Sequence, residues 1–406
     1  MRILWIKAGG LLPADTGGKI RSLAILSHLA RRHEMTVCTF YQRHDSDLHS
    51  TLEKDVARLV AIPLPIPERG SLKDTLGFLK SVVRGKPYKM EKFYHPQVRR
   101  AVYSLAHDTS YDIVLCDFIY PAGVLDWDMP ACKVLFTHNV EAQVWERFSK
   151  VATNIWWRIA SYVEYKAMAR AERKYVTQAD HVLTVSDQDR DFFSSCVEPT
   201  KLTTIPTGVD VEYFAPTPGT AVPSTIVFSG SMDWMPNEDG VLWFVADILP
   251  SIRRHLPEAT FWIVGRNPSA AVQKLETHDG VHVTGTVEDI RPYLSRAAVY
   301  VVPLRSGSGT RLKIFEAMAA GKAVVSTSIG AEGLPVDHGS NILLADEPEA
   351  FAESVVTLLS EPGTAQRLEQ NARHLVETQY GWEAVTRVVE DTLLEACAQT
   401  RRSSTS

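Results

Sequence analysis

The sequence predicts an α/β protein made of two doubly wound parallel sheets. Two observations predict this class. Short apolar runs alternate with helical patterns along the chain, and the alternation breaks once, near the middle. The chain has 406 residues, more than the ~250–300 at which a single core stops growing, so two domains are expected.

The first alternation predicts a domain over residues 1–209. One helix is expected from about residue 18 to 31, and a longer one from Ile155 to Gln178 with Ile159 and Tyr162 on its apolar face. Short buried strands are expected between the helices, at residues 3–6, 35–40, 59–62, 113–115, 134–136, 182–185 and 202–205.

Residues 210–224 interrupt this pattern with Pro216, Pro218, Gly219 and Pro223, which predicts a linker. The alternation then resumes and predicts a second domain over residues 225–378. Its strands are expected at residues 225–228, 261–264, 281–283, 300–302 and 323–326, with helices from about 237, near 288–296 and around 316.

Composition predicts a soluble cytosolic protein. The five cysteines are scattered and show no spacing typical of a zinc site, which fits a reduced compartment without a structural metal. No apolar run approaches ~18 residues, and the first residues lack the features of a signal peptide. The net charge of −5 argues against nucleic acid as a partner.

One segment, residues 73–100, is strongly basic, with eight basic and two acidic side chains. Apolar residues at helical spacing accompany the charges, so the segment suits an amphipathic helix on anionic lipid headgroups. A solvated basic face over the core explains the pattern equally well. The patch residues expected to contact a membrane or an acceptor are Lys80, Arg84, Lys86 and Lys89.

A glycine-rich turn before a helix predicts a phosphate cradle at residues 306–321. Its glycines let a ligand approach the backbone, and a threonine caps a helix whose first N–H groups attract an anion. Two cations in that first turn oppose the helix dipole unless an anion sits in front of them. The predicted cradle comprises Gly307, Ser308, Gly309, Thr310, Arg311 and Lys313.

Glu316 follows Lys313 by three residues and therefore shares its helical face. Its carboxylate suits the two cis hydroxyls of a ribose next to the phosphates. A surface pair between Lys313 and Glu316 is the alternative. Glycines also follow several strands of the second domain, where ligands bind in open α/β sheets, although each one alone fits an ordinary turn; they are Gly230, Gly265, Gly285 and Gly307.

The order of motifs resembles family 4 of the retaining, nucleotide-sugar-dependent glycosyltransferases with the GT-B fold, and within it the bacterial exopolysaccharide-type sugar transferases. The resemblance covers nearly the whole chain. It is carried by the segments 17–21, 137–141, 185–187, 205–210, 228–231, 313–321 and 380–382. It implies two Rossmann-like domains facing an interdomain cleft, with residues 379–406 forming a terminal helix that crosses back to the first domain and a tail.

The resemblance also implies roles for individual residues. The first domain would receive the acceptor, and His138 would point at the transferred sugar. Glu316 would bind the ribose, and the backbone of the segment from Val283 to Val287, with Val283 and Thr286 as its named contacts, would hold the base. The remaining implied donor-binding positions are Gly17 and Gly18, over the diphosphate, and Gly230 and Ser231, after the first strand of the second domain.

The chain departs from the family at the diphosphate clamp. Many members carry an arginine and a lysine where this chain has Ser231 and Asn237, and a glutamate where it has Ser308. A departing nucleoside diphosphate still needs cations, so Arg311 and Lys313 are the expected replacements, with Arg266 as a weaker candidate.

These observations lead to a retaining transfer of a hexose from a UDP- or GDP-linked sugar to a hydroxyl of a glycan or lipid-linked acceptor, in polysaccharide or glycolipid synthesis. His138, Arg311 and Lys313 are the expected catalytic residues. The resemblance implies that the enzyme acts without a metal, and no other cofactor is expected. The enzyme is expected in the cytoplasm, peripheral to the inner face of the membrane. A nucleotide-sugar epimerase and a catalytically silent binding module are the alternatives, and an NAD dehydrogenase is disfavoured because no GxGxxG follows the opening strand.

Overall fold

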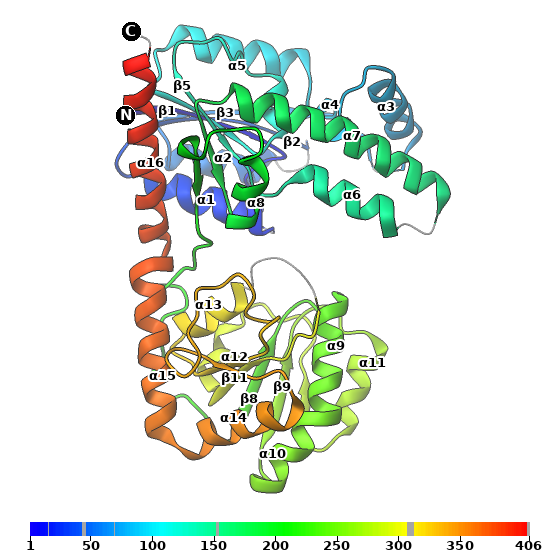
Figure 1. The fold of residues 1–406 in the computed structure, drawn as a ribbon, viewed down its shortest axis with the longest axis vertical. Helices are drawn as coiled ribbons and strands as arrows, with labels where there is room; N and C mark the ends of the chain where they lie inside the picture. The colour runs from blue at the N-terminus through cyan, green and yellow to red at the C-terminus, as the bar shows by residue number, and fades with distance from the viewer. Residues whose placement is uncertain (15, 43–45, 69, 152–153, 307–311, 404–406) are drawn as a thin grey trace. The chain divides into compact units, whose positions relative to one another are not determined.

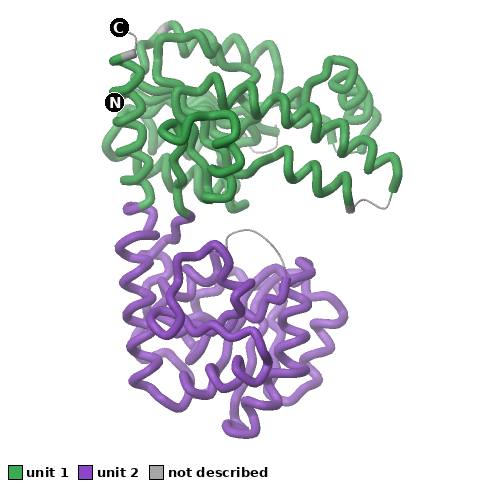
Figure 2. Tube along the Cα trace, viewed as in Figure 1, with its two compact units in different colours: residues 1–206, 385–406 green, residues 207–384 purple. Residues whose placement is uncertain are grey.

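The computed structural model describes residues 1–14, 16–42, 46–68, 70–151, 154–306 and 312–403. Figure 1 shows two sheets, each covered by helices. The chain divides into two compact units, drawn in separate colours in Figure 2. The first unit comprises Met1–Pro206 and Val385–Ser406, and the second comprises Thr207–Ala384. Contacts thus divide the chain at 206/207 rather than at the expected 209/210, and the returning segment begins at 385 rather than 379.

The first sheet has seven parallel strands in the order β3-β2-β1-β4-β5-β6-β7. Its central strands are buried on both faces, with Trp5, Phe40 and Phe136 fully enclosed, as expected for a sheet covered by helices on each side. The strands are β1 (Arg2–Ala8), β2 (Glu34–Gln42), β3 (Arg58–Leu64), β4 (Ile113–Asp117), β5 (Cys132–Phe136), β6 (His181–Thr184) and β7 (Leu202–Thr204).

Eight helices before residue 206 accompany this sheet in the part of the chain that is described. They are α1 (Gly17–Ala30), α2 (Ser46–Ser50), α3 (Leu72–Val83), α4 (Tyr88–Glu91), α5 (Pro96–Asp108), α6 (Glu141–Val151), α7 (Ile155–Gln178) and α8 (Asp187–Phe193). Short 3₁₀ segments lie at Thr51–Lys54, Tyr120–Gly123 and Pro199–Lys201.

The long helix α7 has the expected bounds, but its predicted apolar face is buried only in part. Ile159 and Tyr162 are exposed, whereas Met168, also expected on that face, is buried together with Ser161, Glu164 and Ala167. Glu164 is tolerated there because its carboxylate accepts hydrogen bonds from the backbone N–H groups of the first residues of α4. The apolar side chains at the start of α7 are therefore left in solvent.

The second sheet has six parallel strands in the order β10-β9-β8-β11-β12-β13. In both sheets the strand order reverses beside the first strand of the unit, and the prediction of two doubly wound sheets is confirmed. The strands are β8 (Thr225–Ser229), β9 (Thr260–Val264), β10 (Val281–Val283), β11 (Val299–Val302), β12 (Val324–Ser326) and β13 (Leu343–Leu344).

Helices on both faces bury this sheet in a second core that includes Phe228, Phe244, Phe261 and Phe351. The helices are α9 (Met235–Trp243), α10 (Leu249–His255), α11 (Ala270–Lys274), α12 (Arg291–Arg296), α13 (Leu312–Ala319), α14 (Pro348–Ser360) and α15 (Pro362–Leu375). A 3₁₀ segment lies at Leu275–Thr277, and π-helical turns lie at Phe244–Ile248 and Val376–Tyr380.

The last helix, α16 (Trp382–Ser403), returns the chain to the first unit. Glu390 pairs with Arg32 and His33 there, and Arg401 pairs with Asp112. Just before α16, the chain pairs with the segment that begins the second unit. The Val209 N–H donates there to the Tyr380 carbonyl at 2.7 Å. No helix within the described residues is long and apolar enough to cross a membrane.

Candidate functional site

The second unit contains a cavity of about 490 Å³ at the carboxyl ends of β8 and β9 and the start of α13. This is the sheet edge at which doubly wound folds bind ligands. The lining residues are Ser229, Gly230, Ser231, Trp234, Asn237, Val264, Gly265, Arg266, Thr286, Val287, Ile290, Leu312, Lys313 and Glu316.

Lys313 is held in this cavity by Asn237. Its ammonium donates to the Asn237 side-chain oxygen at 2.8 Å and lies 4.2 Å from the centre of the Phe228 ring. The Asn237 amide in turn donates to the Ser231 carbonyl at 2.8 Å. Asn237 is buried, so its orientation and that of the lysine are fixed together.

Arg266 is held by Ser231 in a similar way. Its Nε donates to the Ser231 hydroxyl at 2.9 Å, and that hydroxyl donates to Asp233 at 2.5 Å. Ser231 and Asn237 are the two positions at which the resemblance leads us to expect an arginine and a lysine. Each of these neutral residues therefore positions a cation that comes from another segment.

Glycine is required at one cavity position, Gly265, and leaves room for side chains at a second, Gly230. A Cβ on Gly265 would lie 1.7 Å from the Gly230 carbonyl oxygen, which no side chain allows. A Cβ on Gly230 would lie 2.7 Å from Lys313 Nζ and 2.6 Å from Asn237 Nδ2. The bare backbone at Gly230 thus leaves the space that the lysine ammonium occupies.

Glu316 lies one helical turn beyond Lys313 and lines the same cavity. Burial raises the pKa of its carboxyl group, and the nearby ammonium of Lys313 opposes that shift. A partly buried carboxylate beside a cation is suited to accept hydrogen bonds from ligand hydroxyls.

The cavity brings together the predicted donor-binding residues Gly230, Ser231, Thr286 and Glu316, the predicted catalytic residue Lys313 and the weaker candidate Arg266. Val283 instead ends strand β10 and does not line the cavity, whereas Val287 does. The remaining predicted cradle residues lie outside the described part of the chain: Gly307, Ser308, Gly309, Thr310 and Arg311.

The first unit carries a buried network at the carboxyl ends of three adjacent strands. Asp117 ends β4, and its Oδ1 lies 3.1 Å from Lys7 Nζ in β1 and 2.8 Å from His138 Nε2 after β5. The Trp5 indole donates to the other carboxylate oxygen at 3.0 Å, and Lys7 also donates to Ser22 in α1. One carboxylate thus satisfies three buried donors.

His138 is neutral in this network. Burial lowers its pKa to about 3, against the opposing effect of Asp117. Burial disfavours the charged form of Asp117, but Lys7 and the hydrogen bond from His138 outweigh it and lower that pKa to about 2. A neutral imidazole that donates from Nε2 to a carboxylate presents Nδ1 as an acceptor.

His138 Nδ1 is buried and has no hydrogen-bond partner among the described residues. The ring is fixed by stacking on Phe118, with centroids 3.9 Å apart and planes 3° from parallel. A Cβ on Gly18 would lie 3.6 Å from Nδ1 and 2.7 Å from the Phe118 ring, so glycine there leaves room for the stacked rings. Gly17 has no atom within 4 Å of its Cβ position, and both glycines form the first turn of α1 rather than a loop.

Sequence reasoning missed Lys7 and Asp117, although it found His138. The signal for both residues is a charged side chain near the end of an otherwise apolar run, in segments 3–8 and 113–117. Buried charges in such runs are paired, and parallel neighbours at the same strand end are the natural partners.

The predicted basic patch keeps its cations at the surface, but they differ in their partners. Lys80, Arg84 and Lys86 are exposed, and the last two share Glu91 at 3.3 and 3.4 Å. The Lys89 side chain is also partly exposed, and its ammonium donates to the Tyr120 hydroxyl at 3.0 Å and lies 3.4 Å from Glu141, whose side chain is buried.

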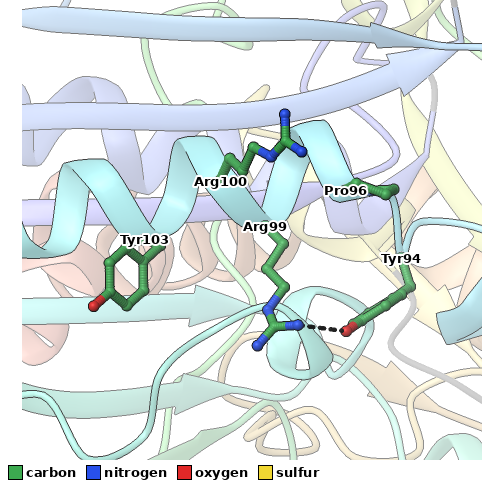
Figure 3. A pocket seen from close by; sticks show the side chains of 5 residues that line it. All are labelled: Tyr94, Pro96, Arg99, Arg100 and Tyr103. Atoms are coloured by element: carbon green, nitrogen blue, oxygen red, sulfur yellow. Dashed lines mark hydrogen bonds between the residues drawn. The ribbon is translucent and has the colours of Figure 1, made fainter.

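A second hollow, of about 400 Å³, lies at the start of α5. Figure 3 shows its lining, in which Arg99 donates to the Tyr94 hydroxyl at 3.4 Å and Arg100 leaves the helix on another side. Pro96 and Tyr103 complete the lining, and no predicted donor-binding residue takes part. Among the residues with described positions, no cluster of three His, Cys, Asp or Glu side chains is arranged to hold a metal ion.

Two family models match successive parts of the chain. The one described as Glycosyltransferase Family 4 matches residues 17–213, and the one described as Glycosyl transferases group 1 matches residues 223–361. The chain belongs to this glycosyltransferase family. The resemblance stated from the motifs is therefore confirmed, and the protein is a glycosyltransferase.

Two relatives illustrate its sequence neighbours. Over 91% of its length the glycosyltransferase is 22% identical to an uncharacterized 44.6 kDa protein in the cps region of Klebsiella pneumoniae, of which 93% is covered. It is 27% identical over 253 residues to a GDP-mannose-dependent alpha-(1-6)-phosphatidylinositol monomannoside mannosyltransferase of Mycobacterium tuberculosis. That match spans 56% of this chain and 65% of the relative.

Solved structures confirm the GT-B type of fold. Sucrose-phosphate synthase from Thermosynechococcus elongatus superposes with a TM-score of 0.66 at 20% identity, over 98% of this chain and 100% of the other. Anabaena HepE in complex with UDP-glucose gives 0.64 at 16% identity, over 97% and 100%. WaaG, a glycosyltransferase involved in lipopolysaccharide biosynthesis, gives 0.60 at 17% identity, over 97% and 99%.

Proposed function

We propose that this glycosyltransferase moves a hexose from a UDP- or GDP-linked sugar to a hydroxyl acceptor, with retention at the anomeric carbon. The observation that carries the proposal is the relocated clamp, in which Ser231 and Asn237 hold Arg266 and Lys313 in one cavity with Glu316. The UDP-glucose complex of the structural neighbour and the GDP-mannose named for the mycobacterial relative support a nucleotide sugar as donor.

In this proposal the two cations hold the diphosphate. The leaving group carries two to three negative charges, and cations fixed in advance stabilise it without reorganisation during the reaction. Lys313 and Arg266 come from separate segments, so they contact a ligand from two directions. Arg311, two residues before Lys313 in the chain, is the proposed third cation.

The nucleoside occupies the rest of the cavity. Glu316 accepts hydrogen bonds from the two ribose hydroxyls, and the backbone beside Thr286 and Val287 contacts the base. The partly buried carboxylate gains these two hydrogen bonds only when the ribose is bound.

His138 accepts a hydrogen bond from a hydroxyl of the transferred sugar through Nδ1, which has no other partner among the described residues. The acceptor oxygen forms a bond to the anomeric carbon as the bond to the diphosphate oxygen breaks. The acceptor proton passes to that leaving oxygen on the same face, so no carboxylate base is needed and the configuration is retained. The proposed reaction uses neither a metal nor another cofactor.

The proposed acceptor is a glycan or lipid-linked sugar of polysaccharide or glycolipid synthesis. The cps-region relative, the mannosyltransferase that names a phosphatidylinositol mannoside, and WaaG support this choice. The proposed location is the cytoplasm, at the inner face of the membrane.

A thermal-shift panel of UDP, GDP and ADP and their glucose and mannose derivatives tests the donor site. One nucleotide is expected to raise the melting temperature most, since a ligand that binds only the folded state stabilises it. Lys313→Ala and Arg266→Ala should each weaken the binding of that nucleotide at least about tenfold. Lys274→Ala, which removes an exposed cation outside the cavity, should leave the binding unchanged. Equal shifts in all three variants would refute the clamp.

Turnover distinguishes transfer from the alternatives. Incubation with the stabilising nucleotide sugar should release the nucleoside diphosphate, faster when an acceptor is added. Binding without release would favour the silent module instead. Conversion to the epimeric sugar would favour the epimerase.

A further inference from the structure

The start of α7 exposes a group of large apolar side chains. Residues 154–159 are all exposed, and among them Ile155, Trp156, Trp157 and Ile159 are apolar. Trp156 is 76% exposed. Proteins that stay in water rarely expose several large apolar side chains together, and tryptophan in particular favours the boundary between water and lipid. We call Ile155–Ile159 the α7 tip.

Helix α3 exposes a second apolar group, on a single face. Leu72, Leu76, Leu79 and Val83 are separated by four, three and four residues, so they form one stripe along the helix. All four are exposed, with Leu72 at 76% and Val83 at 88%. The stripe that would normally pack on a core therefore faces solvent.

The two apolar groups belong to neighbouring elements. Tyr88, at the start of α4, donates its hydroxyl to Asp74 of α3 at 2.6 Å and its backbone N–H to Glu164 of α7 at 2.9 Å. Figure 1 shows α3 beside α7, with the α6–α7 pair projecting from the same part of the unit. The stripe and the tip are thus held on one side of the first sheet.

The charges around the apolar groups are mainly positive. Lys73, Lys80 and Arg84 are exposed on α3, and Arg158 lies within the α7 tip. The one acidic residue of α3, Asp74, is turned toward Lys92, with which it pairs at 2.7 Å. Lys86 lies 5.0 Å from the ring of Tyr94, so the arginine-lined hollow of Figure 3 adjoins the end of α3.

We propose that the α3 stripe and the α7 tip insert into the headgroup layer of an anionic lipid bilayer. Apolar side chains enter the interface, tryptophans lie at its boundary, and the flanking cations meet lipid phosphates. A second copy of the chain fits less well, because the same cations would face each other. The inference extends the proposed function by bringing a lipid-linked acceptor within reach, but binding needs no donor.

Vesicle sedimentation of the whole protein tests this surface. Binding is expected to phosphatidylcholine vesicles that contain about 30 mol% phosphatidylglycerol, and at least about tenfold less to phosphatidylcholine alone. Trp156→Ser/Trp157→Ser and Leu76→Ser/Leu79→Ser should each lower binding to anionic vesicles at least about tenfold. Leu394→Ser, which changes an exposed leucine of α16, should bind like the wild type.

Charge and oligomeric state complete the test. Lys80→Glu/Arg84→Glu should weaken binding, and salt should weaken the wild type in the same way. Each variant is first checked for an unchanged melting temperature. Absent binding of the wild type to anionic vesicles, or wild-type binding by the tryptophan variant, overturns the proposal. A dimer that only the tip and stripe variants dissociate, without vesicle binding, would assign the surface to a second copy. None of these outcomes depends on the donor thermal shifts, so the two proposals fail separately.

Discussion

Both units place cations at the carboxyl ends of the strands of a parallel sheet, but the partners of those cations differ in charge. In the first unit, Lys7 is buried and neutralised by Asp117, and the group left open is the uncharged Nδ1 of His138. In the second unit, Lys313 and Arg266 are positioned by neutral side chains at a cavity. The first arrangement suits an uncharged ligand such as a sugar hydroxyl, and the second suits an anion.

The largest expected effect is on the buried network. Asp117→Ala leaves the ammonium of Lys7 without its carboxylate and the His138 Nε2–H without its acceptor. Breaking a buried pair in this way should lower the free energy of unfolding by about 3–5 kcal/mol, measured by urea denaturation. Lys313→Ala, the corresponding change in the second unit, should cost less than about 1 kcal/mol. Similar losses in both variants would remove the contrast between the units.

Acid should weaken the first unit through His138. Its pKa is about 3 in the folded protein against 6.5 when unfolded, so stability is complete above pH 6.5 and falls as the pH drops toward 3. The loss should reach about 3 kcal/mol at pH 4. Asp117 adds a loss in the same direction only below about pH 4, because its pKa is about 2. Unfolding between pH 7 and 4 should depend less on pH in His138→Gln, and an unchanged slope would contradict the neutral imidazole.

Removal of the cation in the second unit should affect catalysis rather than folding. Lys313→Ala should lower turnover at least about tenfold, which corresponds to about 1.4 kcal/mol in the barrier, with an unchanged melting temperature. Steady-state release of nucleoside diphosphate measures it, with Lys274→Ala as the matched control. Wild-type turnover in Lys313→Ala would mean that the ammonium does not bind the ligand and has at most a structural role in the cavity.

The smallest expected effect comes from one methyl group beside that cation. Gly230→Ala places a Cβ where the Lys313 ammonium and the Asn237 amide meet, so donor affinity should fall about three- to tenfold. The nucleotide thermal shift reports the change. Gly363→Ala is the control, because nothing lies within 4 Å of its Cβ position. An equal loss in both would show that Gly230 is not matched to the cation.

Whether the sequence predicted a group of site residues depended on how far apart those residues lie along the chain. Lys313 and Glu316 could be recognised together because a single helix carries them at a spacing that aligns their side chains. The partnership of Lys7, Asp117 and His138 was not predicted, because it depends on the register of β1 against β4 and β5. The fold itself was predictable, since the strand-and-helix alternation is local and repeated in both halves.

Some patterns in the sequence could be interpreted only once the structure showed what surrounds them. From the motifs alone, Ser231 and Asn237 read as a missing clamp, whereas in the structure each positions a cation from elsewhere. Likewise, Ile159 and Tyr162 were assigned from the sequence to an apolar face of α7, although both side chains lie in solvent. Periodicity identifies an apolar face but does not say what covers it.

The returning helix α16 makes the first unit discontinuous, and this constrains how the enzyme can be recombined with its relatives. A chimera that exchanges residues 1–206 alone would separate Glu390 from Arg32 and Arg401 from Asp112. The first unit should therefore be transplanted as two segments at once, the first 206 residues together with those from 385 onward. A single splice point would join halves whose interlocking parts come from different parents.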